Sequence, residues 1–179
     1  MKTNSKSSRS GFTLVEMMVT VAMIGIVVAF GIQTMTEISK NDRLTPNVNA
    51  LIGHLALARS EAVKRSIQVS ICVSSNADSA DPNCTGGIAW EDGWIVYIDA
   101  DGNNSRDPGE EVLRAQQAFE GQNRLTPGGG LGTSVTYDYR GFATATGNFL
   151  LCDNRTGPHG KFVTITNTGR VRAEGDAAC

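Results

Sequence analysis

The sequence lacks the short motifs that mark common enzyme classes. It contains no G-x-S-x-G, no G-x-x-x-x-G-K-[ST] and no H-E-x-x-H, the patterns of α/β-hydrolases, P-loop nucleotide hydrolases and zinc proteases. His54 falls on the polar side of a helical pattern and His159 in a Gly-Pro-His-Gly turn, and neither stands at a recognised spacing from a nucleophile. The sequence therefore predicts a protein that is not an enzyme and that carries no cofactor.

Charged side chains are nearly absent from Phe12 to Ile32, where Glu16 is the one ionisable residue. A helix over this range would be roughly 31 Å long, enough to cross a bilayer. Lys2, Lys6 and Arg9 precede it without any acid, so the positive-inside rule keeps the N-terminus cytoplasmic and places the rest of the chain in the periplasm. No small-residue cleavage site of a secretory signal peptide follows the run. Because a carboxylate inside a membrane span is costly, Glu16 needs a partner.

A C-x-x-C pair is also missing, which argues against a structural zinc site and predicts no metal on the cysteines. The four cysteines are Cys72, Cys84, Cys152 and Cys179, all beyond the apolar run. An even count in the oxidising periplasm favours two disulfides, for which three pairings are possible. We favour Cys72–Cys84, which closes a short loop, and Cys152–Cys179, which fastens the C-terminus.

The order of segments at the N-terminus is a basic leader, then Gly11-Phe12-Thr-Leu-Val-Glu16, then the apolar helix. This order resembles the class III signal of type IV pilins and type II secretion pseudopilins, with the pattern G-F-[ST]-L-[IVL]-E. The resemblance implies that prepilin peptidase cuts between Gly11 and Phe12 and that the new amino group of Phe12 is methylated. It also implies that the Glu16 carboxylate neutralises the N-terminal amine of a neighbouring subunit, which supplies the partner that the energetics require.

The residues after the apolar run predict an amphipathic continuation of the helix over 33–65. Thr45-Pro46 can restart a helix as N-cap and first residue, and a stripe of Leu51, Leu55, Ala58 and Ala62 follows at helical spacing. The string LARSEAVKR, residues 57–65, resembles the corresponding stretch of the GspH/FimT/FimU family of minor pilins and pseudopilins, and its charged residues are interpreted as a solvated face.

Alternating and bounded apolar segments predict a β-rich domain over 66–179. The expected strands lie at 67–73, 90–98, 111–114, 134–139, 149–152, 161–166 and 169–172, and Gly128-Gly129-Gly130 is interpreted as a turn. One helix followed by many strands predicts an α+β domain with an antiparallel sheet packed on the helix. The family resemblance implies the same arrangement, the type IV pilin fold. The predicted organisation is a leader over 1–11, a transmembrane or filament-core helix over 12–32, the amphipathic helix and the β-rich domain.

One acidic loop has the spacing of a calcium loop. Oxygen-bearing side chains from Asp99 to Glu110 stand at offsets 1, 3, 5, 9 and 12. Asn104 replaces the glycine usual at the sixth position, no helices flank the loop, and Asp, Asn and Gly are also ordinary turn residues. On the sequence alone, no metal site is assigned there.

The sharpest candidate for binding is Gly169-Arg170-Val171-Arg172. In a strand, Arg170 and Arg172 would project from one face about 6.6 Å apart, a spacing that suits successive phosphates of a nucleic-acid strand. The motif resembles the GRxR signature of FimT proteins, which implies capture of double-stranded DNA during natural transformation. Lys161, and less directly Arg155, could widen the patch, whereas Glu174 and Asp176 would weaken it. Arginines that only protect an edge strand from pairing are the structural alternative.

Together these features predict a minor type IV pilin of the GspH/FimT/FimU family, assembled at the pilus tip or in its initiation complex, that binds DNA through Arg170 and Arg172. Prepilin peptidase, major and minor pilins and the inner membrane are its expected partners. The expected location is the inner membrane with a periplasmic domain, and then the extracellular pilus. A purely structural minor pilin and the H pseudopilin of type II secretion are the alternatives.

Overall fold

The structure is a computed structural model that describes residues 11–179, except for the side chains of residues 30–43. The predicted leader therefore lies, apart from Gly11, outside the described residues. The chain divides into two compact units, Met1–Asn41 and Asp42–Cys179, and each is considered by itself. The second unit contains the buried core, every strand and both disulfides.

A single helix, α1, runs from Leu14 to Arg65. It does not restart at Pro46 as expected, because Pro46 lies inside the helix. A proline there removes one backbone hydrogen bond and typically costs about 3 kcal/mol. Leu44 and Val48, on either side of it, are 2% and 7% exposed and belong to the core. Their packing accounts for the helix continuing past the proline.

The first unit presents apolar side chains on all sides of α1. Eleven of them between Leu14 and Val28, together with Phe12 just before the helix, are at least half exposed in the single chain. A helix that is apolar all round requires an apolar environment or packed partners. By length and mean hydropathy, none of the described helices qualifies as a membrane span.

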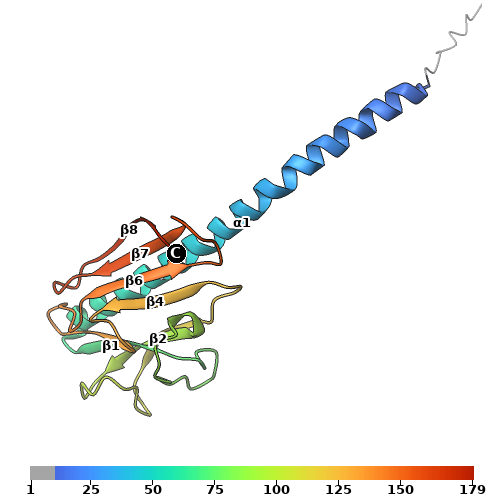
Figure 1. Ribbon diagram of the computed structural model, residues 1–179. Coiled ribbons are helices and arrows are strands. Elements are labelled where there is room, and N and C mark those ends of the chain that lie inside the picture. The colour runs from blue at the N-terminus through green and yellow to red at the C-terminus, as the bar shows by residue number, and fades with distance from the viewer. Residues whose placement is uncertain (1–10) are drawn as a thin grey trace, which may run out of the picture. The chain divides into compact units, whose positions relative to one another are not determined.

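The second unit consists of the C-terminal part of α1 and two antiparallel sheets (Figure 1). The first sheet has the order β3-β2-β1-β5, and the second has the order β4-β6-β7-β8. The strands are β1 (Gln68–Val73), β2 (Gly93–Asp99), β3 (Val112–Gln117), β4 (Arg124–Gly129), β5 (Ser134–Tyr137), β6 (Gly147–Cys152), β7 (Gly160–Ile165) and β8 (Val171–Ala177), with a 3-10 turn, η1 (Trp90–Asp92), before β2. The α+β class with a helix on antiparallel strands is confirmed, although two sheets replace the expected single one.

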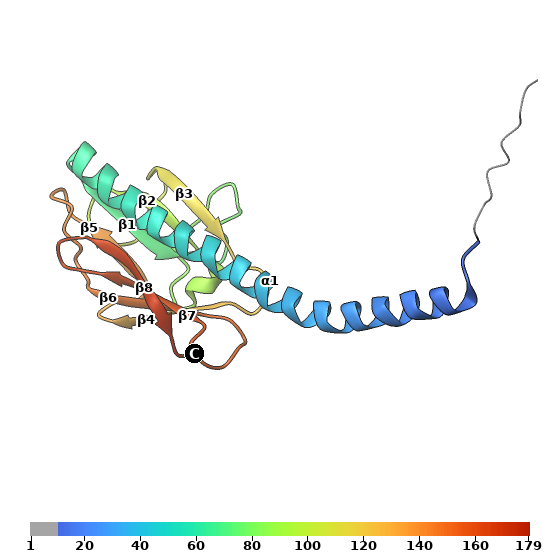
Figure 2. The same ribbon diagram turned by 90° about the horizontal axis from the view of Figure 1, so that it is seen from above.

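The C-terminal part of α1 lies along the two sheets, as Figure 2 shows from above, and its predicted stripe belongs to their common core. Leu51, Leu55, Ala58 and Ala62 are all buried and share one core with side chains of both sheets. Trp90 joins the sheets, because its Nε1 donates to the carbonyl of Gly132 at 2.8 Å and its ring meets Phe149 edge-on at 4.8 Å. The helix ends where Ser66 adopts a left-handed φ of 54° and the amide of Ile67 donates to the carbonyl of Ala62, which turns the chain back into β1.

Strand β1 is buried on both faces rather than on one, which corrects the half-buried interpretation of its alternation. One face meets the helix, and the loop after β1 covers the other. The Cys72–Cys84 disulfide holds that loop, and Cys72 packs there with Ala77, Ile95 and Tyr97. The polar residue Ser70 is accommodated because its hydroxyl bonds to Asp99 and Thr136. Both disulfides have the favoured pairing, since Cys152 is joined to Cys179.

The run Gly128-Gly129-Gly130 forms the expected turn, in which the amide of Leu131 donates to the carbonyl of Gly128, but its first two residues also end strand β4, which the sequence did not predict. Glycine is required where β4 pairs with the start of β6. A Cβ on Gly147, opposite Gly129 in β6, would lie 2.1 Å from the carbonyl oxygen of Gly128. The glycines here permit both the turn, where Gly129 has a φ of 70°, and the close approach of two strands.

Replacing Leu55 by alanine should lower the free energy of unfolding of the second unit by about 2 to 5 kcal/mol, because its side chain is 0% exposed and lies between the helix and both sheets. Urea denaturation of residues 42–179 measures this change. Ile88→Ala is the control, since Ile88 is 63% exposed and should change stability by less than about 0.5 kcal/mol. Equal effects of the two substitutions would contradict the packing described here.

Candidate functional site

The tight connection between β7 and β8 places the predicted arginines. The amide of Gly169 donates to the carbonyl of Thr166, and the amide of Thr166 donates to the carbonyl of Arg170. Gly169 has a φ of 75°, and a Cβ there would lie 2.0 Å from the carbonyl oxygen of Gly141. Only glycine allows this approach, so Gly169 sets the position of the arginine that follows it.

Arg170 and Arg172 are both exposed, and the half-buried Val171 between them packs on the core. Arg172 pairs with Thr164 across the hairpin, and the main-chain bond to Thr166 continues the same alternation to Arg170. The two arginines therefore leave the hairpin on one side, as the motif predicts. Within the described part of the chain, neither guanidinium is engaged in an ion pair.

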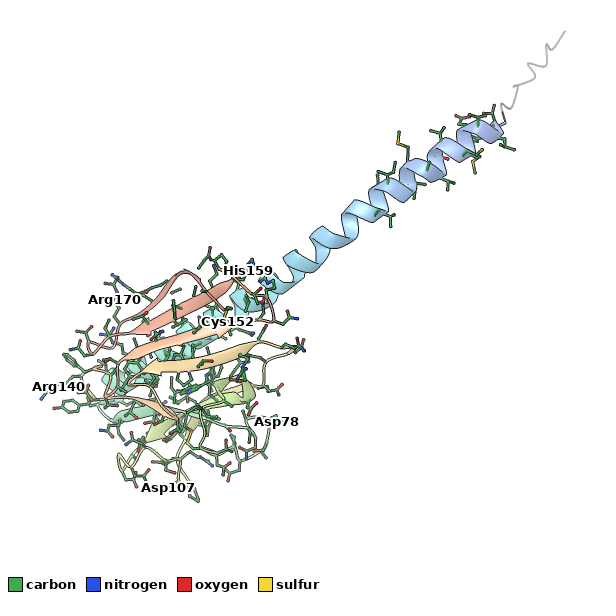
Figure 3. All side chains as sticks on the ribbon, viewed as in Figure 1. Asp78, Asp107, Arg140, Cys152, His159 and Arg170 are labelled. Carbon is green, nitrogen blue, oxygen red and sulfur yellow. A yellow bond between two sulfur atoms is a disulfide. The ribbon has the colours of Figure 1, made fainter. Side chains whose placement is uncertain are left out.

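Arg170 also lines a groove of about 910 Å³ between α1 and the hairpin turns. Three further cationic residues, Arg59, Lys64 and Arg140, line the same groove, and no carboxylate does. Its apolar surface comes from Ile52, Ala56, Val63 and Val171. Figure 3 shows Arg140 and Arg170 on the left side of the domain, on the opposite side from Asp78. The groove is therefore a locally cationic surface on a chain with a net charge of −2.

Arg59 and Arg140 are held by neighbouring groups. The Nε of Arg59 donates to the carbonyl of Gly141 at 3.0 Å, which links the helix to the turn between β5 and β6. The Nε of Arg140 donates to the hydroxyl of Tyr139 at 3.0 Å, and the guanidinium lies 5.1 Å from the Tyr139 ring centroid. Fixed guanidinium groups lose less conformational entropy when they bind an anion.

Two of the predicted contributors do not join this surface. Lys161 forms an ion pair with Asp176 near the far end of β8, and this contact lowers the pKa of the Asp176 carboxyl. Arg155 is paired with Asp153 at 2.6 Å, and its side chain is 8% exposed. The groove therefore has Arg59, Lys64 and Arg140 beside Arg170 in place of Lys161 and Arg155, and Lys64 is itself ion-paired with Glu61 at 3.3 Å.

The sequence contained a partial signal for the added residues. Arg59 and Lys64 belong to the LARSEAVKR string, where they were interpreted as an ordinary solvated face. Arg140 follows Asp138-Tyr139 in a turn, and its nearness to Arg170 depends on the contact of two turns far apart in the sequence. No local pattern reports such a contact.

His54 is a structural residue rather than a solvated one. Its Nδ1 accepts a hydrogen bond from the Nε1 of Trp94 at 3.0 Å, so the ring must be unprotonated on that nitrogen. Burial, and secondarily the charge of Arg114, lower the pKa of His54 below its usual value of 6.5. This places His54 in the packing between α1 and β2.

The predicted processing residues Phe12 and Glu16 lie just before and within the first turn of α1. Thr13 caps the helix, because its Oγ1 accepts a hydrogen bond from the amide of Glu16 at 3.3 Å. Glu16 occupies the third position of the helix, as in a capping box, where a carboxylate also complements the helix dipole. The side chains of Phe12 and Glu16 are exposed, so both are accessible to another molecule.

A family model described as the type II transport protein GspH matches residues 47–169. The chain belongs to the GspH family. A model of the prokaryotic N-terminal methylation motif matches residues 6–32, which include Gly11, Phe12 and Glu16. The family and this motif together support a minor-pilin or pseudopilin-like protein that is processed by prepilin peptidase and acts with other pilins.

Two crystal structures of the type IV minor pilin FimU from Pseudomonas aeruginosa have a similar fold. One is 20% identical, with a TM-score of 0.59, and the match covers 76% of this chain and 92% of FimU. The other, from a second crystal form, is 20% identical, with a TM-score of 0.54 and coverage of 73% and 92%. No curated protein matches the chain by sequence. The similarity to FimU confirms the type IV pilin fold of this GspH-family chain.

His54 predicts a pH dependence of stability. Because its pKa is lower in the folded than in the unfolded state, the unfolded state gains a proton first as the pH falls below about 6.5. The domain should therefore lose stability between about pH 7 and pH 5.5, above the range in which carboxylates titrate. Urea midpoints over this range measure the loss.

His54→Gln should flatten this pH dependence, since a glutamine Oε1 can accept the Trp94 hydrogen bond without titrating. His159→Gln, which removes the other histidine, is the matched control and should retain the wild-type slope. Equal slopes in wild type and His54→Gln would contradict the assigned role.

Proposed function

We propose that this GspH-family chain is a minor type IV pilin whose folded domain binds double-stranded DNA through Arg170 and Arg172. The observation that carries the proposal is the exposed guanidinium pair on the β7–β8 hairpin, of which Arg170 also lines the cationic groove with Arg140, Arg59 and Lys64. Arginine forks suit phosphate oxygens, and contacts of this kind are strong but independent of base sequence.

The distribution of charge on the domain favours binding of DNA at the groove and hairpin rather than at the acidic segment. Nine acids and one base lie between Asp78 and Glu111, whereas the groove contains four cationic residues and no acid. A polyanion is repelled by the first surface and attracted by the second, so the net charge of the chain does not prevent local binding. Three carboxylates border the site: Glu61 pairs with Lys64 at 3.3 Å, Asp138 accepts a hydrogen bond from the Arg140 amide at 2.9 Å, and Glu174 stands two residues after Arg172 on β8. These charges weaken the site, although among the described residues none of them is ion-paired with Arg170.

The N-terminal residues complete the proposed role. Prepilin peptidase cuts between Gly11 and Phe12, the new amino group is methylated, and the Glu16 carboxylate pairs with the N-terminal amine of a neighbouring subunit. The exposed apolar side chains between Phe12 and Val28 are then covered, first by the inner membrane and afterwards by other pilins in the filament. The folded domain is periplasmic before assembly and extracellular in the pilus, near its tip, where it serves DNA uptake in natural transformation.

One alternative role is favoured by a specific observation. The matching family model is described as a type II transport protein, and a pseudopilin H of type II secretion would have the same leader, helix and sheets. A structural minor pilin resembling FimU would have them too. Neither alternative role requires affinity for DNA. A measurement of binding to a DNA duplex therefore distinguishes the proposed function from both alternatives.

Binding to a labelled duplex, measured by fluorescence anisotropy across a salt series, tests the proposal. Residues 38–179 with oxidised disulfides should bind with an affinity that falls steeply with salt. Arg170→Gln/Arg172→Gln should lower the affinity at least about tenfold. The slope of log K against log salt concentration should become shallower by the amount expected for about two lost phosphate contacts. Arg140→Gln should reduce the same slope by the amount expected for about one lost phosphate contact.

The matched control is Arg114→Gln/Arg124→Gln, which removes the same charge from exposed arginines outside the groove. It should leave the slope unchanged. Absence of binding by the wild type at low salt, or equal losses in both double variants, would refute DNA binding and favour one of the structural roles.

A further inference from the structure

The loop between β2 and β3 gathers three carboxylates at one point. Asp99 ends β2, Asp101 follows it, and Glu110 lies just before β3, and one oxygen of each is within 4.8 Å of the others. Carboxylates this close repel one another unless a proton or a cation intervenes. Among the described residues, none of the three is ion-paired with a lysine or arginine. Arg106 bonds instead to Asp81 and to the backbone carbonyls of Pro82 and Glu110.

Asp99 supplies an independent sign that a ligand belongs there. Its side chain is 0% exposed. The Oδ2 atom accepts hydrogen bonds from the Ser70 hydroxyl at 2.8 Å and from the Asn104 amide at 3.1 Å. The Oδ1 atom is shielded from solvent, and no described group donates to it. A buried carboxylate oxygen without a partner is strongly unfavourable, so a missing cation is a physical explanation for it.

A second buried oxygen faces the same loop. Gln68, which pairs with Asp99 across β1 and β2, has a solvent-shielded Oε1 that also has no donor among the described residues. A Cβ on Gly102 would lie 2.6 Å from this oxygen, which places it against the Asp101-Gly102 segment. A neutral amide oxygen beside three carboxylates is a common kind of ligand for a hard cation.

The spacing of the loop identifies the class of cation. Asp99, Asp101 and Glu110 occupy the first, third and twelfth positions of a calcium loop, and these are the residues that the fold brings together. The sixth position, where calcium loops have glycine, is Asn104, which adopts a left-handed φ of 60°. Asparagine is among the few residues that tolerate this conformation, so the sequence departure leaves the turn intact.

We propose that Asp99, Asp101 and Glu110, with Gln68 beside them, form a calcium-binding site. Calcium accepts six to eight oxygen ligands in flexible geometry, whereas magnesium demands a near-ideal octahedron and retains its waters. The bound ion ties the end of β2 to the start of β3. The next residue, Glu111, pairs with Arg65 at the end of α1 at 2.6 Å, so the ion also steadies the loop beside the helix terminus. This site is independent of the proposed DNA contacts.

Isothermal titration of calcium chloride into the full chain, held in detergent micelles and stripped with EDTA, tests the site. The wild type should show one saturable event with a dissociation constant of about 10⁻⁴ to 10⁻³ M, the range of extracellular calcium modules. Asp101→Asn should weaken binding at least about tenfold. Asp101 suits the test because it is exposed and its carboxylate bonds only to Asn103 among the described residues, so the fold should survive.

Asp78→Asn is the matched control, since it removes the same charge from the same acidic stretch but outside the cluster. It should bind calcium like the wild type. Thermal unfolding gives a second readout: calcium should raise the Tm of the wild type and of Asp78→Asn but not that of Asp101→Asn, while all three unfold alike in EDTA. No saturable calcium binding, wild-type affinity in Asp101→Asn, or equal affinity for magnesium would each overturn the assignment.

Discussion

The packing of the α1 stripe onto both sheets is the interaction on which the rest of the folded domain depends. Ala58 and Ala62 are fully buried, and their small side chains allow the helix backbone to approach the strands closely. The contact also fixes Arg59, whose Nε donates to the carbonyl of Gly141. Gly141 in turn lies against Gly169 in the β7–β8 connection. The helix stripe thus helps to determine where Arg140, just before Gly141, and Arg170, just after Gly169, line the groove.

The same architecture separates opposite charges on one domain. The β2–β3 loop collects carboxylates because β2 ends in a buried aspartate and β3 begins after two glutamates. The hairpin turns collect guanidinium groups beside the helix. Each surface suits a different kind of partner, a hard cation at the first and a polyanion at the second. The proposed cation site and the proposed DNA contacts share no residue, so the two proposals are compatible on a chain of modest net charge.

Much of the fold could be predicted from local patterns. The helical stripe, the two disulfide pairings and most strands follow from periodicity, loop length and turn residues, as Leu51 or Cys72 illustrate. The missed features depend on tertiary contacts. Burial of β1 on both faces requires the covering loop, β4 requires the close pairing of Gly128 with β6, and the uninterrupted helix at Pro46 requires core packing on either side. The sequence motif identified the arginine pair. Arg140 could not be predicted to lie at the groove with Arg170, because this depends on the contact between the turns that contain Gly141 and Gly169.

Mapping the DNA contact by NMR tests the central claim most directly. Amide shifts of ¹⁵N-labelled residues 38–179 would be followed while an unlabelled duplex is added. The proposed function predicts perturbations concentrated at Thr166, Gly169 to Arg172 and the turn that carries Arg140, with the acidic loop from Asp99 to Glu110 unchanged. Perturbations absent from the hairpin, or centred on any other surface, would contradict the assignment of this groove as the DNA-binding face.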